Sequence, residues 1–276
     1  MRKTWIVVAF LVLWAALQAP ALLAQFTPEE LALRPQEEEF LKAAEIVGQE
    51  QLGGVEAVTN PWVLTLKQGD VTHKALWKNA EGRMHGYIEG WQYEIAAYLL
   101  DKDLGLNMVP PTVERRFRGD RGSCQYWVDD TMSLKYRTEH NIKMPSYRVF
   151  NWDRATYLQR FFDNLIANED RHQNQILITK DWRMILIDHS RTFRTSKKFT
   201  DRLIYTEKHP EGPKLMSELP RAIVEKVKAL TFEGIRSVVG TYLTDEEIRD
   251  VLVRRDLILK EIDKLIKKYG ESNVLY

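Results

Sequence analysis

The chain has 276 residues, of which 44% are hydrophobic and 29% charged, so its length and composition suit one large or two modest globular domains. The sequence contains no internal repeat or low-complexity tract, which excludes disordered, collagen-like and solenoid classes. Lys and Arg (40 residues) nearly balance Asp and Glu (39 residues), and a net charge of +1 gives no support to non-specific nucleic-acid binding.

The first 24 residues differ from the rest of the chain. Two basic residues precede an apolar run from Trp5 to Leu17, and small residues close that run. This pattern is typical of a secretory leader, so we expect residues 1–24 to be a signal peptide and the protein to be exported to a periplasmic, extracellular or secretory-lumen location. If the leader stays uncleaved, residues 5–24 form a membrane anchor, and we expect no other membrane contact.

The first half of the chain predicts strands with one inserted helix. Residues 25–45 are expected to form a linker and a first helix, because Thr27-Pro28-Glu29-Glu30 is a capping signal with proline at the first helical position. The residues from 46 onward carry alternating apolar patterns that turn signals separate. These patterns predict strands at 62–66, 71–78, 112–117 and 123–128, a helix at 90–103, and turns at 68–70 and 119–122.

After Asp130 the pattern becomes mainly helical. Apolar spacing predicts helices at 154–167, 220–230, 231–241 and 245–268, a short β pair at 176–178 and 184–187, and a polar loop at 191–219. We therefore expect an α+β fold with two lobes. Residues 46–128 form a small antiparallel β-rich lobe with one helix, and residues 129–276 form a larger helical lobe, with the candidate site in the cleft between them.

Four charged residues follow elements that would bring them together at this cleft. Asp170 lies between a predicted helix and the short β pair, and Asp188 ends that pair. Phosphoryl transfer uses one carboxylate to orient the attacking hydroxyl and another to hold a divalent metal on the triphosphate. It also needs a lysine that reaches the phosphates and an acid that holds this lysine. Lys78, at the end of a strand, and Glu94, on the next helix, fit these two roles.

Five segments in this order resemble the atypical kinases: Ala75–Lys78, Glu94–Tyr98, Val109–Val113, Asn168–His172 and Leu186–Ser190. Within that group the chain is most similar to secretory-pathway casein kinases of the family-with-sequence-similarity-20 type and their bacterial relatives. Phosphatidylinositol 3- and 4-kinases and HipA-type kinases are more distant. The resemblance spans residues 46–270 and implies a bilobal protein-kinase-like fold that binds ATP and Mg²⁺ or Mn²⁺ in its cleft.

The resemblance also implies roles for individual residues. Lys78 contacts the α- and β-phosphates, Glu94 pairs with Lys78, Asp170 is the catalytic base and Asp188 is a metal ligand. The other implied site residues bind the nucleotide or the metal: Gly53 and Gly54 in the phosphate loop, Trp127, Val128 and Asp129 at the hinge beside the adenine, and Asn174 and Gln175 as metal-binding amides.

The chain departs from the family pattern at three places near these residues. Gln175 replaces an Asn or Glu, His189-Ser190 replaces a glycine after the second acid, and the phosphate loop contains only Gly53-Gly54. The function that the resemblance implies is an exported ATP-dependent kinase, which transfers the γ-phosphate to a Ser/Thr hydroxyl of a protein or to a sugar-like acceptor. Two alternatives stay open: a pseudokinase that serves as a binding module without turnover, and transfer of AMP on the same fold.

Overall fold

The computed structural model describes residues 25–53, 60–84, 86–206 and 217–276. The predicted leader at 1–24 and Gly54 lie outside these residues. Among the helices that the structure describes, none is long and apolar enough to cross a membrane.

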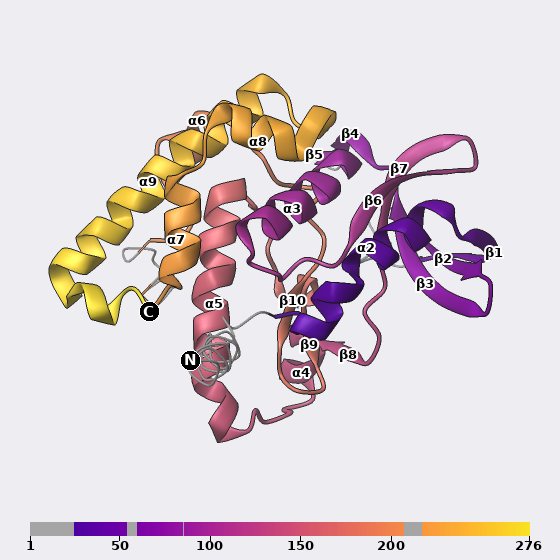
Figure 1. The fold of residues 1–276 in the computed structure, drawn as a ribbon, viewed down its shortest axis with the longest axis horizontal. Coiled ribbons are helices and arrows are strands. Elements are labelled where there is room, and N and C mark those ends of the chain that lie inside the picture. Colours follow the sequence, from indigo (N-terminus) through magenta and orange to yellow (C-terminus); the bar gives the residue numbers. More distant parts are fainter. Residues whose placement is uncertain (1–24, 54–59, 85, 207–216) are drawn as a thin grey trace, which may run out of the picture.

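A five-stranded antiparallel sheet forms the first part of the molecule (Figure 1). Its spatial order is β1-β2-β3-β7-β6, with β1 at Glu45–Gln51, β2 at Trp62–Gln68, β3 at Val71–Lys78, β6 at Thr112–Phe117 and β7 at Asp120–Tyr126. Helix α2 (Pro28–Ala43) packs on this sheet through buried Phe40 and Leu41. The predicted antiparallel sheet and its turn near Gly69 are confirmed.

Helix α2 begins as its sequence predicts. The Thr27 hydroxyl accepts a hydrogen bond from the Glu30 N–H, and the Glu30 carboxylate accepts one from the Thr27 N–H at 2.6 Å. This capping box satisfies two backbone donors that a helix start leaves without partners. The local sequence therefore fixes where α2 starts.

Helix α3 (Trp91–Leu104) connects the sheet with the rest of the molecule. It contacts β6 and β7 on one side and α8 on the other, and its Tyr98 and Leu100 are fully buried in the main core. Gly105 ends the helix in the left-handed conformation (φ 76°), which glycine adopts without steric cost. Because α3 packs against both parts, Glu94 on this helix has a fixed position relative to the cleft.

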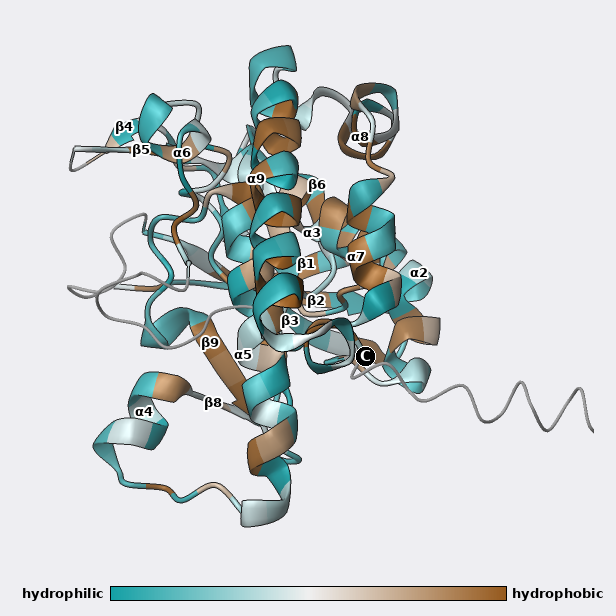
Figure 2. Cartoon of the chain, turned by 90° about the vertical axis from the view of Figure 1, so that its left-hand side faces the viewer, coloured by the Kyte–Doolittle hydropathy of each residue, from teal (hydrophilic) through white to brown (hydrophobic). Residues whose placement is uncertain are grey.

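Helices dominate the second part, as predicted. The longer ones are α5 (Ser146–Ile166), α7 (Arg221–Lys228), α8 (Phe232–Val239) and α9 (Asp245–Tyr269), and short 3₁₀ turns lie at η1 (Gln173–Gln175), η2 (Gly240–Tyr242) and η3 (Glu271–Asn273). Helices α5 and α9 pack side by side (Figure 1). Hydrophobic residues alternate with hydrophilic ones along α9 (Figure 2), and its buried residues, among them Ile258 and Ile262, belong to the main core.

A three-stranded sheet of order β10-β9-β8 lies in this second part, where the sequence predicts only a pair. Its strands are β8 (Thr131–Ser133), β9 (Ile176–Thr179) and β10 (Met184–Leu186). Strand β9 is hydrophobic over nearly its whole length (Figure 2). The third strand, β8, is half-buried and too short to show a period, so its sequence carries no strand signal.

Some predicted boundaries are wrong. Strand β7 begins at Asp120 and ends at Tyr126, because Arg118 and Gly119 alone form the turn that precedes it, both with positive φ. Helix α5 begins at Ser146 rather than Arg154. Its first turns are partly exposed and lack the apolar face that marks its second half.

Besides β8, four other short strands and α-helices were not predicted. They are β4 (Glu81–Met84), β5 (Tyr87–Gly90), α4 (Leu134–Glu139) and α6 (Lys197–Thr200), the last within the expected polar loop. Each has six residues or fewer, which is below the length over which apolar periodicity can be recognised. The α+β class, with the β-rich part before the helical part, is confirmed.

Candidate active site

Lys78 is the last residue of β3 and joins two acidic side chains. Its Nζ atom lies 2.8 Å from Oε1 of Glu94 and 2.8 Å from Oδ1 of Asp188. The neighbouring strand β7 approaches closely here, since a Cβ atom on Gly122 would lie 2.4 Å from the Lys78 carbonyl oxygen. Only glycine fits at this position, so the packing of β7 on β3 helps to fix the lysine.

The three charges shift one another's proton affinity. Burial alone would lower the pKa of Lys78, but Asp188 and Glu94 outweigh it and raise that pKa above its ordinary value. Burial alone would raise the pKa values of both carboxyl groups, and Lys78 instead brings each of them below its ordinary value. At neutral pH the cluster therefore holds one ammonium and two carboxylates.

Asp188 follows β10 with an unusual backbone conformation. Its φ is 62°, in the left-handed region that non-glycine residues rarely adopt. The Ser190 hydroxyl donates to its Oδ1 at 3.1 Å, and the next backbone N–H, of His189, donates to Glu94 at 2.8 Å. Strain of this kind is maintained only where surrounding contacts over-determine the geometry, and such positions cluster at functional sites.

Asp170 lies in the loop that follows α5. Ala167 ends that helix in the left-handed conformation, and the side chain of Asn168 turns the loop by accepting a hydrogen bond from the Asp170 N–H at 3.1 Å. The amide of Asn168 in turn donates to buried Asp163 on α5 at 3.1 Å. About a third of the Asp170 side chain remains exposed, so it can meet a ligand.

A buried ion pair, Arg171–Asp163, connects the Asp170 loop with the residues on either side of Asp188. Arg171 donates to Asp163 from Nε and Nη2, at 3.1 Å and 3.0 Å, and both side chains are almost fully buried. Its Nη2 also lies 2.9 Å from Nε2 of His189, and its Nη1 donates to the Ile187 carbonyl oxygen at 2.7 Å. Burial lowers the pKa of His189, so the neutral ring accepts from Arg171.

The two predicted metal-binding amides differ in orientation. Gln175 is buried, and its Nε2 faces both Asp170 and Asp188 at 3.3 Å, while its Oε1 accepts the His172 N–H. Gln175 therefore presents a donor to the acids and no oxygen to a cation, which argues against it as a metal ligand in this conformation. Asn174 lines the cavity described next and is the amide that fits the expected role.

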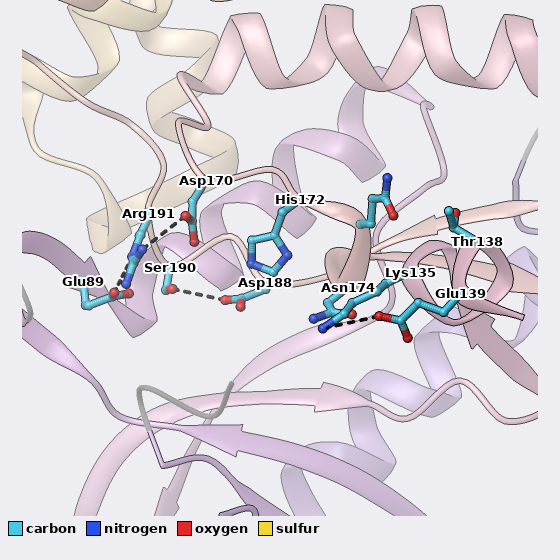
Figure 3. A pocket seen from close by; sticks show the side chains of 11 residues that line it. Glu89, Lys135, Thr138, Glu139, Asp170, His172, Asn174, Asp188, Ser190 and Arg191 are labelled. Atoms are coloured by element: carbon cyan, nitrogen blue, oxygen red, sulfur yellow. Dashed lines mark hydrogen bonds and ion pairs between the residues drawn. The ribbon is translucent and has the colours of Figure 1, made fainter. Parts of the chain in front are cut away.

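A cavity of about 640 Å³ opens between the two parts of the molecule and contains both acids (Figure 3). Its lining residues come from the β5 strand, α4, the Asp170 loop and the segment after β10: Glu89, Lys135, Thr138, Glu139, Asp170, His172, Gln173, Asn174, Asp188, Ser190 and Arg191. Glu89, Arg191 and the α4 residues were not predicted from the sequence to belong to the site. Glu89 is a carboxylate directly before the predicted helix at 90–103, and this position is the sequence feature that could have marked it as a site residue.

Glu89 supplies the observation that tests whether a metal fits here. Its side chain is 1% exposed and lines the cavity that contains Asp188. Its Oε2 atom has no hydrogen-bond partner among the described residues. A buried carboxylate oxygen without a partner is costly unless a cation completes it, so Glu89 is a candidate ligand for a divalent metal in the cavity that Asp188 and Asn174 also line.

Protein groups alone do not surround such an ion. No three His, Cys, Asp or Glu side chains in the described ranges are grouped so as to hold a metal. Mg²⁺ in phosphoryl-transfer sites is commonly held by one or two carboxylates together with substrate phosphates. The donor set matches that kind of site, in which the nucleotide supplies the remaining oxygens.

The described residues of the predicted phosphate loop and hinge do not line this cavity. Gly53 follows β1 and is exposed. Trp127, Val128 and Asp129 link β7 to β8, and His73 holds this link through a 2.8 Å hydrogen bond with the Trp127 carbonyl oxygen. Their contacts with phosphate and adenine stay predictions.

The fold is shared with solved kinase structures. The crystal structure of the Golgi casein kinase superposes on this chain with a TM-score of 0.62 and 14% sequence identity. The superposition covers 91% of this chain and 80% of the kinase. Hydra Fam20 with sugar gives a TM-score of 0.62 at 14% identity, with 93% of that chain covered. The chain has a kinase-like fold. The Golgi casein kinase with Mn/ADP bound shares this kinase-like fold, with a TM-score of 0.63 at 14% identity and coverages of 91% and 80%. No protein-family model and no curated protein matches the sequence.

Proposed function

We propose that this chain is an ATP-dependent phosphotransferase that moves the γ-phosphoryl group to a hydroxyl acceptor. The observation that carries the proposal is the position of Lys78, 2.8 Å from both Glu94 and Asp188, beside the cavity that Asp170 lines. Kinases need the lysine–acid pair and the metal-binding carboxylate in place at the same time. One cluster of side chains contains a lysine–acid pair and a second carboxylate of the kind that binds such a metal, which supports the proposal.

Each residue has a separate task in this proposal. Lys78 binds the α- and β-phosphates as a point charge, and Glu94 holds the ammonium in position. Asp170 orients the acceptor hydroxyl and takes its proton. Asp188, Asn174 and Glu89 would hold Mg²⁺ or Mn²⁺, which would neutralise phosphate charge there.

The acceptor and the location are further parts of the proposal. The acceptor is a Ser/Thr hydroxyl of a protein or a sugar-like molecule, and the leader at 1–24 directs export. The kinase-like fold supports the reaction type. One similar structure contains Mn and ADP, and another contains a sugar. These ligands belong to those proteins, and they motivate the choice of metals and acceptors to be tried.

The experiment incubates the full chain with ATP and either Mg²⁺ or Mn²⁺ against a panel of peptides and sugars, with Asp188→Asn as the inactive control. Mass spectrometry of the products identifies the transferred group. Phosphate transfer that Asp188→Asn abolishes supports the proposal. AMP transfer replaces it with the alternative reaction, and metal-dependent nucleotide binding without any transfer replaces it with the pseudokinase. The orientation of Gln175, with a donor toward the acids, is the observation that favours the pseudokinase.

A further inference from the structure

Arg191 lies between two carboxylates with different expected tasks. Its Nη1 is 3.1 Å from Oδ1 of Asp170, and its Nε donates to Oε1 of Glu89 at 2.5 Å. Figure 3 shows the guanidinium reaching from the segment after Asp188 to both of these acids. Arg191 therefore contacts both Asp170, which we expect to orient the acceptor, and Glu89, which we expect to help hold the metal.

The position of Arg191 is fixed before any ligand binds. Its guanidinium lies 4.4 Å from the centre of the Tyr87 ring, and only 14% of the side chain is exposed. The preceding carbonyl oxygen, of Ser190, accepts the Gly90 N–H at the start of α3 at 3.0 Å. Backbone and side chain are thus both held, which is the condition for electrostatic stabilisation without reorganisation.

We propose that Arg191 is a catalytic residue that binds the phosphoryl group during its transfer. The inference rests on the proposed phosphotransferase function. In that reaction the bond from the γ-phosphorus to the β–γ bridging oxygen breaks, and a bond to the acceptor oxygen forms. The acceptor proton goes to Asp170, and ADP leaves with the bridging oxygen. During transfer the phosphoryl group moves from the nucleotide near Asp188 and Glu89 toward the acceptor near Asp170. Arg191 lies between Glu89 and Asp170 and therefore faces this path.

The chemistry of arginine suits this position. The transferred phosphoryl group spreads negative charge over three equatorial oxygens, and a guanidinium presents several donors in one plane. The described contacts engage Nε and Nη1, and no described residue accepts a hydrogen bond from Nη2. Nη2 can therefore donate to a phosphoryl oxygen while Nε keeps its bond to Glu89.

A purely structural role for Arg191 is the competing explanation. In that case the arginine only neutralises Glu89 and Asp170, and it would matter equally for the free protein and for every bound state. A catalytic arginine instead contributes more in the transition state than in the ground state. An analogue of the phosphoryl group in transfer separates the two explanations without knowledge of the acceptor.

The experiment measures the affinity of the full chain for ADP with Mg²⁺, with and without aluminium fluoride, by isothermal titration calorimetry. We expect fluoride to tighten ADP binding by about 100-fold or more, the lower end for transition-state analogues. Arg191→Met should lose the fluoride-dependent increase, while its affinity for ADP and Mg²⁺ without fluoride should change far less. Arg183→Met is the matched control, because Arg183 also bridges two carboxylates, Glu30 and Asp181, but does not line the cavity. It should keep the full increase.

Each outcome decides between the explanations. An undiminished fluoride effect in Arg191→Met overturns the inference, as does an equal loss of ADP affinity without fluoride, or the absence of any fluoride effect in the parent chain. If the parent chain does not bind ADP with Mg²⁺ or Mn²⁺, the proposed function itself fails. Should Arg191→Met not fold, Arg191→Gln gives the same test, since its amide can still donate to Glu89.

Discussion

Lys78 and Glu94 form an ion pair at 2.8 Å, with side chains 8% and 3% exposed. The pair joins the end of β3 to α3, and Asp188 adds a second carboxylate to the same ammonium. Removing the lysine leaves two acids near each other in a largely desolvated site. Leaving buried carboxylates without their cation costs folding free energy, so the cluster contributes to the stability of the protein as well as to ligand binding.

Lys78→Met should reduce the free energy of unfolding by about 3–5 kcal/mol at neutral pH, since it strands the carboxylates. The double variant Lys78→Met/Glu94→Gln should recover part of this loss, because it also removes one stranded charge. Urea unfolding of the three proteins measures both effects. Equal stability of the single and double variants would contradict the prediction.

The stability that the pair contributes should also depend on pH. The folded-state pKa of Glu94 lies below its ordinary value, so the stability from the pair is present above the unfolded pKa and is lost as pH falls through the folded pKa.

Asp170→Asn and Asp188→Asn should have different phenotypes, because the two acids face different partners. Asp170→Asn should leave nucleotide affinity nearly intact and lower turnover by about 10²–10⁴-fold, the usual contribution of a positioned general base. Asp188→Asn should remove the metal-dependent part of nucleotide binding. ATP titration with and without Mn²⁺, alongside a turnover assay, compares the two. The role assignment is wrong if Asp170→Asn abolishes ATP binding and Asp188→Asn spares it.

Gln175→Glu should strengthen metal binding at the expense of the metal-free protein. The new carboxylate would face Asp170 and Asp188, to which the amide now donates at 3.3 Å. Like charges so close repel, so the melting temperature without metal should fall, and Mn²⁺ should raise it more than in the parent chain. Thermal unfolding with and without Mn²⁺ measures both.

Gln68→Glu is the control for Gln175→Glu, because it adds the same charge on an exposed side chain of β2 that does not line the cavity. An equal effect of Mn²⁺ on both variants would show that general charge, rather than the position of residue 175, sets the metal affinity.

Asp101→Asn should change how stability depends on pH. Asp101 is fully buried on α3 and accepts the Met108 N–H at 2.9 Å. Burial raises its pKa to about 7, although Arg34 opposes this. The unfolded chain releases the proton near pH 4, about the ordinary value, so the parent protein loses stability as pH rises from there to about 7.

The asparagine variant lacks that proton, so its stability relative to the parent should improve across this range by at most about 1.4 kcal/mol per pH unit. Urea unfolding of both proteins at about pH 5 and about pH 8 gives the comparison. Parallel curves for the two proteins would show that Asp101 is already ionised in the folded state.

Local signals in the sequence determined much of the fold. The Thr27 capping box, the turn at Gly69 and the stop at Gly105 act within a few residues, so their structural outcome depends little on the rest of the chain. The same holds for the apolar periods of α3 and α9. The predicted elements placed Lys78 at the end of a strand and Glu94 on the next helix, and the structure brings these two side chains together.

Only the tertiary structure decided which side chains complete the cavity and how they point. Glu89 and Arg191 are separated by 102 residues, and their contact depends on the packing of the β4–β5 hairpin against the segment after β10. The orientation of Gln175 depends on which neighbours offer donors and acceptors, and a sequence does not contain that information. Periodicity and caps report on one element at a time, whereas side chains from distant elements converge through packing of the core, where burial and charge choose the partners.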